Sequence, residues 1–240
     1  MPSPTELLFR DDAYLRAGTA SVMSADGGQI QLDRTIFYPL GGGQAGDRGT
    51  LQTAGGQIFR VTDTHKGEVP DSVIHLIEGD TTLLTVGSPI SMALDWDYRY
   101  RLMRLHTCMH LLCAVVPGAV TGGQISDGKA RLDFDIPGDS VDKDDLTAKL
   151  NALIQGNHAV ESRWVTDEEL AAKPELVRTM SVKPPTGTGR VRLLDIVGVD
   201  LQPCGGTHVR NTGEIGPVLV TKIENKGRQN RRINIAFAGL

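Results

Sequence analysis

Apolar residues in the first part of the chain, up to about residue 95, come in short runs that alternate with polar ones. The runs include TASVMSA, QIFRVTDTH and SPISMALD, and turn segments such as GGGQAGDRG and KGEVPD separate them. Alternation with period two between turn residues is typical of β-strands. We therefore expect a small, mostly antiparallel and barrel-like β domain over residues 1–95.

A helical pattern replaces the alternation at residue 96. The segment 96–116 contains no glycine or proline, and its apolar residues recur every three or four positions up to the break at Pro117. A second helix should begin near Ser140 or Asp142, either of which can cap it, and end near Gly156.

Strand patterns return in the second half of the chain, at 131–136, 160–165, 177–182, 190–196, 216–225 and 231–237. The fold class is therefore α+β. We expect two domains, a β-rich glycine-loop domain at 1–95 and, at 96–240, a domain in which two main helices pack on a mostly antiparallel sheet.

Composition narrows the function classes. With 40% hydrophobic and 22% charged residues in 240, the chain falls in the globular range, which argues against disorder, fibres and coiled coils. The first residues show no signal-peptide pattern and no long apolar stretch follows, so we expect a soluble cytoplasmic protein with no membrane partner. Three cysteines are too few and odd in number for a disulfide framework, which favours a reducing compartment.

Charge is unevenly distributed behind a net value of −4. Residues 139–175 carry nine acids against four bases, whereas residues 210–240 carry six bases against two acids. A basic end can be a solvated edge or a surface that contacts the phosphates of a nucleic acid. The charge count alone leaves both interpretations open.

Two histidines, His106 and His110, lie four residues apart in the first predicted helix. This spacing places both rings on one face, where they can bind a single ion. Position 107 is threonine, so the chain lacks the glutamate of the HExxH peptidase motif. A metalloprotease is therefore a poor interpretation.

A second candidate for metal binding is the segment Cys204-Gly-Gly-Thr-His208. Glycines permit a sharp backbone path that can turn a thiolate and an imidazole toward one point. One cysteine and three histidines would fill a tetrahedral site, and filled sites are usually structural, whereas catalytic sites keep a position for water. The sequence leaves open whether such an ion is catalytic, structural or a holder of substrate.

These motifs carry a family resemblance. HTCMHLL, then GGQISDGKARLDF, then CGGTH, with FYPLGGGQAGDRG in the first half, resemble the editing domain of alanyl-tRNA synthetase and, more closely, the free-standing alanyl-tRNA editing proteins of the AlaX group. The chain is too short to include the activation domain of the synthetase, which predicts a trans-acting editor. Two positions depart from the synthetase pattern: Met109 replaces a threonine and Leu40 replaces an acid.

The resemblance implies a zinc-dependent deacylase that hydrolyses mischarged tRNA(Ala), chiefly Ser-tRNA(Ala), with Gly-tRNA(Ala) left open as a second substrate. By position, His106, His110, Cys204 and His208 would hold one zinc ion per chain. Gln124 would orient substrate or water. The hydroxyl of Thr107 would either contact the substrate or bond to the preceding helical turn.

Other residues keep alternative interpretations. We expect Cys108 and Cys113 to pack in the core. The loop Gly41–Gly49 is either a tight turn or a backbone surface for the tRNA acceptor end. Arg190 and Arg192 are weaker candidates for RNA contact, and His65, His75 and His158 receive no role. The best candidates for tRNA binding are Lys222, Lys226, Arg228, Arg231 and Arg232.

Two alternative functions remain at this point. One is a non-catalytic zinc module that binds structured RNA, and the other is editing of a different tRNA, such as the threonine acceptor charged with serine. The oligomeric state, the nucleophile and the general base cannot be predicted from these patterns.

Overall fold

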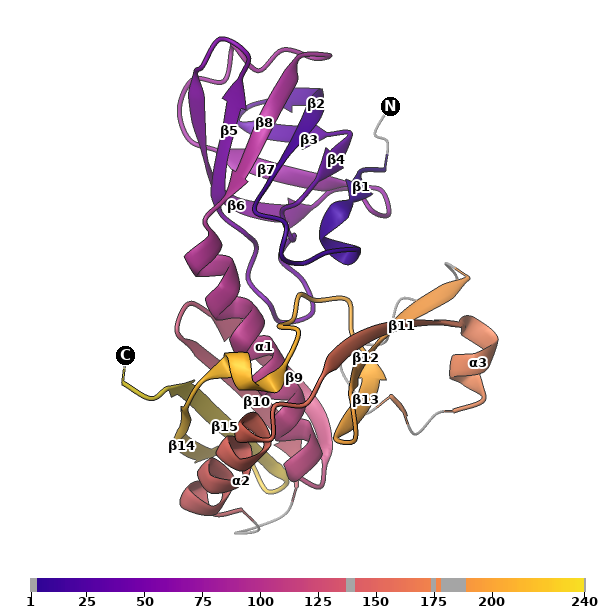
Figure 1. The fold of residues 1–240 in the computed structure, drawn as a ribbon, viewed down its shortest axis with the longest axis vertical. Coiled ribbons are helices and arrows are strands. Elements are labelled where there is room, and N and C mark those ends of the chain that lie inside the picture. Colours follow the sequence, from indigo (N-terminus) through magenta and orange to yellow (C-terminus); the bar gives the residue numbers. More distant parts are fainter. Residues whose placement is uncertain (1–3, 137–140, 174–175, 178–188, 240) are drawn as a thin grey trace. The chain divides into compact units, whose positions relative to one another are not determined.

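A computed structural model of the protein describes residues 4–136, 141–173, 176–177 and 189–239. The chain forms two compact units, Met1–Arg101 and Leu102–Leu240, and the 20-residue helix α1 (Trp96–Val115) spans the division between them (Figure 1). The α+β class and the antiparallel β character of the first part are confirmed. In the described part of the chain, no helix is long and apolar enough to cross a membrane.

The first unit is a closed barrel with the strand order β2-β3-β7-β6-β5-β8. Every neighbouring pair is antiparallel, and alternate side chains point inward, so Val22, Leu32, Leu51 and Val61 are buried. This arrangement confirms the barrel-like prediction. The barrel strands are β2 (Ala17–Asp26), β3 (Gln29–Leu32), β5 (Gly49–Thr53), β6 (Ile58–Lys66), β7 (Val73–Ile77) and β8 (Pro89–Leu94).

Three short elements outside the barrel precede β5. Strands β1 (Glu6–Leu7) and β4 (Arg34–Thr35) form a parallel pair, and the 3-10 helix η1 (Leu8–Arg10) follows β1. The glycine-rich segment connects β4 to β5.

The glycine-rich loop is closed by paired backbone hydrogen bonds between Gly41 and Gln44, across Gly42 and Gly43 at φ 59° and 85°. These two φ values are in the left-handed region that favours glycine. The tight-turn interpretation of the loop is thus confirmed, whereas a contact with RNA stays a prediction.

A fully buried ion pair anchors the end of this loop. The Arg99 guanidinium donates to the Asp47 carboxylate, with Nε 2.9 Å from Oδ1, and also to the carbonyls of Ala13 and Ile36. Asp47 in turn accepts from the backbone N–H of Tyr38. All these residues belong to the first unit, so the pair holds the loop and the start of α1 to the barrel wall.

The larger sheet of the second unit has the order β14-β15-β10-β9, with all pairs antiparallel. One face is apolar and buried, for example at Leu132, Phe134, Ile233 and Ile235, and the other face is polar. The strands are β9 (Ala119–Ser126), β10 (Lys129–Asp135), β14 (Val218–Asn225) and β15 (Asn230–Phe237).

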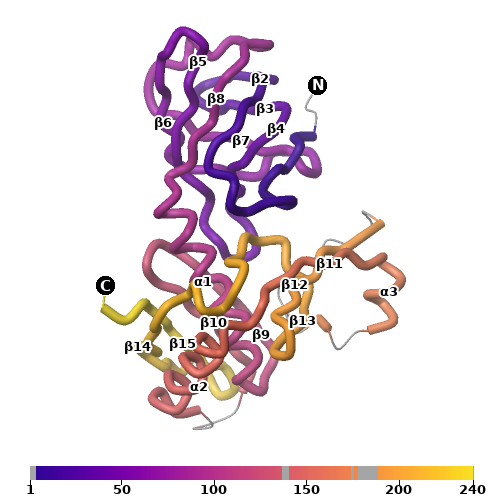
Figure 2. The backbone as a smooth tube through the Cα atoms, in the orientation of Figure 1, coloured from indigo at the N-terminus to yellow at the C-terminus, as the bar shows by residue number. Residues whose placement is uncertain are grey.

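Both predicted helices are present. Helix α1 buries Leu102, Leu105 and Leu112. Helix α2 (Lys143–Gln155) is capped by Asp142, packs beside β14 and exchanges two hydrogen bonds between Asn151 and the backbone of Val218 (Figure 2). Ser140, the alternative cap, lies outside the described residues.

A three-stranded antiparallel sheet completes the second unit. It consists of β11 (Val160–Thr166), β12 (Arg190–Ile196) and β13 (Asp200–Pro203). One of its faces packs with Leu170 of the short helix α3 (Asp167–Ala171). A 3-10 helix, η3 (Thr212–Ile215), lies between β13 and β14.

The structure differs from the prediction at several elements. Strands β9 and β13 and helix α3 were not predicted. The glycines at 122 and 123 interrupt the alternation of β9, whereas β13 and α3, with four and five residues, are too short for a period to show. The strand predicted at 177–182 lies, beyond its first residue, outside the described residues.

Candidate metal centre

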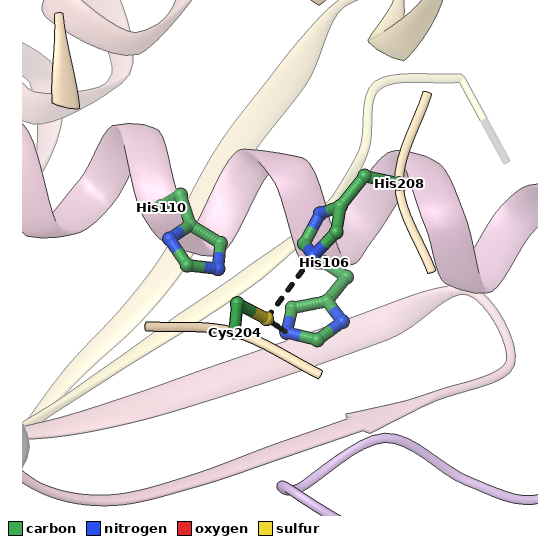
Figure 3. A group of neighbouring side chains, drawn as sticks. All are labelled: His106, His110, Cys204 and His208. Atoms are coloured by element: carbon green, nitrogen blue, oxygen red, sulfur yellow. Dashed lines mark hydrogen bonds between the residues drawn. The ribbon is translucent and has the colours of Figure 1, made fainter. Parts of the chain in front are cut away.

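Four side chains from two distant parts of the chain converge in the second unit. His106 and His110 lie one turn apart on α1, and Cys204 and His208 belong to the loop that follows β13 (Figure 3). One nitrogen of each histidine and the sulfur of Cys204 all lie within 4.8 Å of one another. We call these four residues the candidate metal centre.

The donor set and its spacing fit a zinc ion. Zinc binds thiolate sulfur at about 2.3 Å and imidazole nitrogen at about 2.0 Å, so tetrahedral ligand atoms lie roughly 3.3–3.5 Å apart. The Cys204 Sγ atom lies 3.1 Å from Nε2 of His208 and 3.5 Å from Nε2 of His106. The three histidines are between 5% and 7% exposed. The candidate metal centre could therefore hold a metal ion.

Electrostatics inside the candidate metal centre favour a thiolate. Burial alone would raise the pKa of the Cys204 thiol, but the neighbouring imidazoles of His106, His208 and His110 hold this pKa well below its usual value. Burial would lower the pKa of His110, yet the charges of Cys204 and Asp200 raise it to about 9. Burial and the charge of His106 lower the pKa of His208.

Thr107 fixes the orientation of one ligand. Its buried hydroxyl lies 3.1 Å from the carbonyl of Met103, to which it donates, and 3.2 Å from Nδ1 of His208. Because the single hydroxyl proton points to Met103, the oxygen accepts from Nδ1–H of His208 and from the N–H of Val209. This tautomer leaves Nε2 of His208 available as a ligand. Of the two predicted interpretations of Thr107, the bond to the preceding turn is confirmed.

Asp200, which sequence analysis missed, supports a second ligand. Its Oδ2 atom lies 3.4 Å from Nδ1 of His110, and Gln202 donates to the same oxygen. A carboxylate beside the outer nitrogen of a ligating histidine orients the ring and increases its basicity. The only sequence signal was an acid four residues before Cys204, at the start of a strand too short to predict.

Arg192 holds the loop that carries Cys204. Its guanidinium donates to the carbonyl of Gly206 at 2.7 Å and to the carbonyl of Cys204 at 3.3 Å. The φ angles of Gly205 and Gly206 lie outside the left-handed region, so this loop does not require glycine for its φ angles. The N–H of Gly206 points to the Cys204 sulfur, 3.5 Å away.

Comparisons with known proteins agree with this geometry. Residues 191–234 match the family model described as threonyl and alanyl tRNA synthetase second additional domain, and residues 12–98 match that of class II (A) tRNA synthetases. Two proteins named alanyl-tRNA editing protein AlaX-M, from Saccharolobus solfataricus and Methanosarcina acetivorans, are 34% and 36% identical to the chain. Each alignment covers 95% of this chain and 97% of the relative.

The chain belongs to the AlaX-M family of alanyl-tRNA editing proteins. It also resembles an alanine–tRNA ligase from Sulfurisphaera tokodaii, at 32% identity over 92% of this chain but only 25% of the ligase. The resemblance expected from the motifs is thereby confirmed.

Gln124, the other residue predicted to be catalytic in this chain, lies on β9. Its side chain is exposed, and it faces Arg131 of β10 in the sheet register. In the part of the chain that the structure describes, no hydrogen bond joins the Gln124 side chain to the candidate metal centre. Its predicted role stays a prediction.

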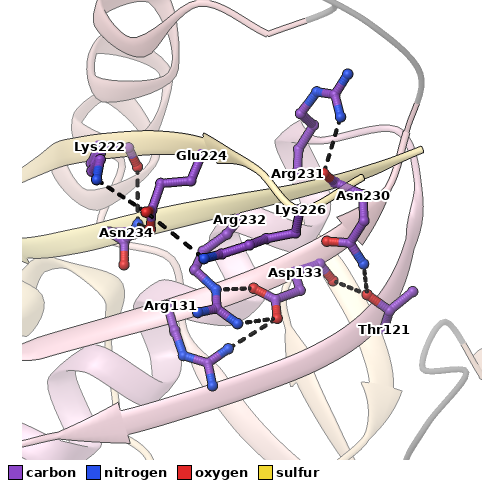
Figure 4. Close-up of polar contacts among 10 residues, drawn as sticks. All are labelled: Thr121, Arg131, Asp133, Lys222, Glu224, Lys226, Asn230, Arg231, Arg232 and Asn234. Carbon is purple, nitrogen blue, oxygen red and sulfur yellow. Dashed lines mark hydrogen bonds and ion pairs between the residues drawn. The ribbon is translucent and has the colours of Figure 1, made fainter. Parts of the chain in front are cut away.

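The basic candidates for tRNA binding lie on the β14–β15 hairpin and differ in their surroundings (Figure 4). Lys222, Lys226 and Arg228 are exposed, and Glu224 lies within ion-pair distance of both lysines. Arg232 pairs with Asp133 at 2.7 Å and thereby lowers the pKa of that carboxyl.

Arg231 points elsewhere in the same hairpin. Only 6% of the residue is exposed, and its guanidinium donates to the carbonyls of Gly227 and Asn230. The hairpin therefore presents three exposed cations, whereas Arg231 bonds within the hairpin and Arg232 pairs with Asp133 of β10.

The other two cysteines lie in the core, and the two residues that differ from the synthetase pattern lie in different surroundings. Cys108 and Cys113 are buried in α1, which confirms core packing, and burial raises the pKa of Cys108 to about 12. Met109 is buried in the same helix, whereas Leu40 is 49% exposed beside the glycine-rich loop.

Proposed function

We propose that this protein is a zinc-dependent aminoacyl-tRNA deacylase that acts in trans on mischarged tRNA(Ala). Its main substrate is Ser-tRNA(Ala), and Gly-tRNA(Ala) is a second one. The convergence of His106, His110, Cys204 and His208 within 4.8 Å carries the proposal. The near full-length match to proteins named alanyl-tRNA editing proteins supports the choice of tRNA.

Editing of this kind has a physical reason. A pocket that accepts alanine cannot strongly reject glycine, and serine adds only one hydroxyl group. Such differences are worth too little binding energy for accurate selection in one step. A second site that hydrolyses the wrong ester corrects the error after it is made.

The reaction is the addition of water across the ester between serine and the terminal ribose. The acyl–oxygen bond breaks, serine leaves with a free carboxylate, and the ribose hydroxyl regains its proton. When bound, a zinc ion supplies positive charge that can polarise the ester carbonyl or lower the pKa of water. Gln124 orients the substrate or the water in this proposal.

The residues around the candidate metal centre prepare it for this role. Thr107 holds His208 in the tautomer that presents Nε2, and Asp200 lies against the outer nitrogen of His110. Arg192 holds the carbonyls on both sides of Gly205. The second unit itself thus holds His208 and the Cys204 loop and places a carboxylate beside His110 before the substrate arrives.

The tRNA is held through its phosphates by the exposed cations Lys222, Lys226 and Arg228. Reversal of two charges, K226E/R228E, should raise the KM for tRNA and reduce its dependence on salt, because fewer counterions are released on binding. The matched control is K143E, at an exposed lysine of α2. Equal salt dependence in both variants and the wild type would remove this part of the proposal.

A paired deacylation assay tests the function itself. The wild-type protein should release serine from Ser-tRNA(Ala) much faster than alanine from Ala-tRNA(Ala), and a chelator or C204A should abolish the release. The control C113A removes a buried thiol outside the candidate metal centre and should keep the activity.

Two results would replace the proposal. Equal and slow loss of both amino acids, as in buffer alone, would indicate a non-catalytic zinc module that binds RNA. Faster release from Ser-tRNA(Thr) than from Ser-tRNA(Ala) would indicate editing of the threonine acceptor.

A further inference from the structure

An exposed tryptophan lies on the three-stranded sheet next to the candidate metal centre. Trp164 of β11 is 43% exposed, and the guanidinium carbon of Arg190 lies 4.8 Å from the centre of its ring. An aromatic ring beside a cation is the pair of groups with which proteins hold single-stranded nucleic acid. The ring of Trp164 and the guanidinium of Arg190 are therefore candidates for contact with a ligand.

The opposite face of this sheet already has its own core. Val191 and Leu193 of β12 are buried there, and they pack with Leu170 of α3 and with Val165 of β11. Successive side chains of a strand point to opposite faces, so Trp164 points away from this core. Its exposure is thus a property of the second face of the sheet.

That second face leads directly to the candidate metal centre. Trp164 lies opposite Arg192 in the register of β11 and β12, and Arg192 donates to the carbonyls of Cys204 and Gly206 and to the hydroxyl of Ser162. The distances for these three bonds are 3.3, 2.7 and 2.6 Å. Only one arginine side chain therefore separates Trp164 from the loop that carries a ligand.

Burial changes steadily along this face. At the inner end, Ile196 of β12 is fully buried, and Asp200 and Gln202 of β13 are 6% and 3% exposed, with Asp200 beside His110. At the outer end, Trp164 and Arg190 are exposed to solvent. The face thus runs from the exposed ring of Trp164 and guanidinium of Arg190, past Arg192, to the buried residues beside the candidate metal centre.

We propose that Trp164, Arg190 and Arg192 bind the single-stranded 3′ end of an RNA, so that its last nucleotide reaches the candidate metal centre. We call these three residues the stacking surface. A base stacks against the ring of Trp164, and the guanidinium of Arg190 contacts a neighbouring phosphate. Arg192, whose guanidinium already bonds to Cys204, Gly206 and Ser162, adds positive charge beside them. The combination of an aromatic platform and cations is the general way in which proteins hold single-stranded nucleic acid without reading its sequence. The inference rests on the proposed function, because it uses an aminoacyl end as the reacting group.

Fluorescence offers a direct test, because the chain contains two tryptophans. In the W96F variant, Trp164 is the sole emitter, and in the matched variant W164F the sole emitter is Trp96 of the first unit. The probe is an acceptor-stem RNA duplex with a single-stranded 3′ ACCA end, compared with the same duplex made blunt. We expect the duplex with the single-stranded end, and not the blunt one, to quench the emission of W96F, and neither to quench W164F.

Kinetics provide a second readout. Loss of one stacked base corresponds to roughly a 10-fold weaker binding or more, so W164A should raise the KM for Ser-tRNA(Ala) by that factor, with little change in kcat. W164F keeps an aromatic ring and should recover most of the loss. R190Q should raise the KM and reduce its salt dependence, while the zinc content of all three variants stays at one per chain.

The stacking surface is overturned if the blunt duplex quenches W96F as strongly as the duplex with the single-stranded end, or if W164A has the KM of the wild type. These outcomes differ from failure of the proposed function. A wild-type protein that hydrolyses no mischarged tRNA, but whose Trp164 emission responds to the single-stranded end, would refute the function and keep the surface. Rapid hydrolysis of mischarged tRNA without a change in Trp164 emission would support the function and refute the stacking surface.

Discussion

The Asp47–Arg99 pair of the first unit and the candidate metal centre of the second unit are both buried polar clusters, but they balance charge in different ways. The carboxylate of Asp47 receives its counter-charge from Arg99, and the guanidinium also bonds to the carbonyls of Ala13 and Ile36. In the candidate metal centre, one sulfur and three nitrogens point at each other across at most 4.8 Å.

This difference separates a structural cluster from a binding cluster. A buried charge is tolerated when it is paired and hydrogen-bonded within the protein, and the Asp47–Arg99 pair meets this condition. Lone-pair donors that converge on one point meet it when a cation occupies that point. The arrangement of donors and acceptors, more than burial, therefore indicates where a ligand belongs.

The largest effect on stability should come from breaking the pair. R99M leaves the Asp47 carboxylate buried without a counter-charge, and we expect the free energy of unfolding to fall by about 3–5 kcal/mol. Urea unfolding measures this loss, with R60M at an exposed arginine of β6 as the control. Zinc content should stay at one ion per chain, because Arg99 contacts none of the ligands; loss of zinc together with stability would contradict the separation of the two clusters.

A pH effect of similar size should arise from His75, another polar group of the barrel with partners inside the protein. Its Nδ1–H donates to the carbonyl of Ile30, and Nε2 accepts from the hydroxyl of Thr35. Burial lowers the pKa of His75 from 6.5 to about 4. The imidazole of the unfolded chain therefore binds a proton more readily than that of the folded protein. The contribution of neutral His75 to the stability of the folded protein is complete above pH 6.5 and is lost as the pH falls toward 4.

The loss over this range is about 3 kcal/mol, from a shift of about 2.5 units at 1.36 kcal/mol each. Urea unfolding of the wild type and H75Q between pH 4 and 7 isolates it, because other groups titrate equally in both. Parallel pH curves for the two proteins would mean that His75 is not held neutral in the barrel.

A smaller effect on metal affinity should follow from D200N, which keeps the shape of the side chain and removes its charge. Residues behind a ligand typically change metal affinity by about 10- to 100-fold, and we expect a loss in this range. Competition with a zinc chelator measures the affinity. D195N, at the neighbouring strand and paired with Arg163, is the control and should leave the affinity unchanged.

The smallest effect should come from G205A in the loop that carries Cys204. A Cβ atom at Gly205 would meet no heavy atom within 4 Å, and its φ is ordinary, so stability should change by less than about 0.5 kcal/mol. At Gly46 the added atom would lie 2.2 Å from the carbonyl oxygen of Thr64, so G46A should be clearly destabilising. Equal melting temperatures for the two variants would show that the glycine-rich loop is less constrained than its contacts imply.

Much of the fold could be predicted from the sequence, because apolar and polar residues alternate over much of the barrel segments and the 20 residues of α1 contain no glycine or proline. The ligands of the candidate metal centre could be proposed from two short motifs, since a spacing of four residues has direct geometric meaning on a helix. Helix α3 was missed although Thr166 and Glu169 form a capping box, because five residues are too few to show periodicity.

The supporting residues could not be predicted in the same way. Asp200, Arg192 and Trp164 act through partners that are far away in the sequence, and they meet these partners only through the pairing of β11, β12 and β13. Arg231 shows how a count of charges can suggest a surface residue that is in fact buried. It belongs to the most basic part of the chain, yet its guanidinium is turned to the carbonyls of its own hairpin.

The most direct test of the account is the rate of serine release from Ser-tRNA(Ala) as zinc is returned to the chelated protein. If His106, His110, Cys204 and His208 hold one catalytic ion, the rate should rise in proportion to added zinc and level off at one equivalent per chain. A rate that is already full in the chelated protein, or that never rises above the buffer value, would contradict the account.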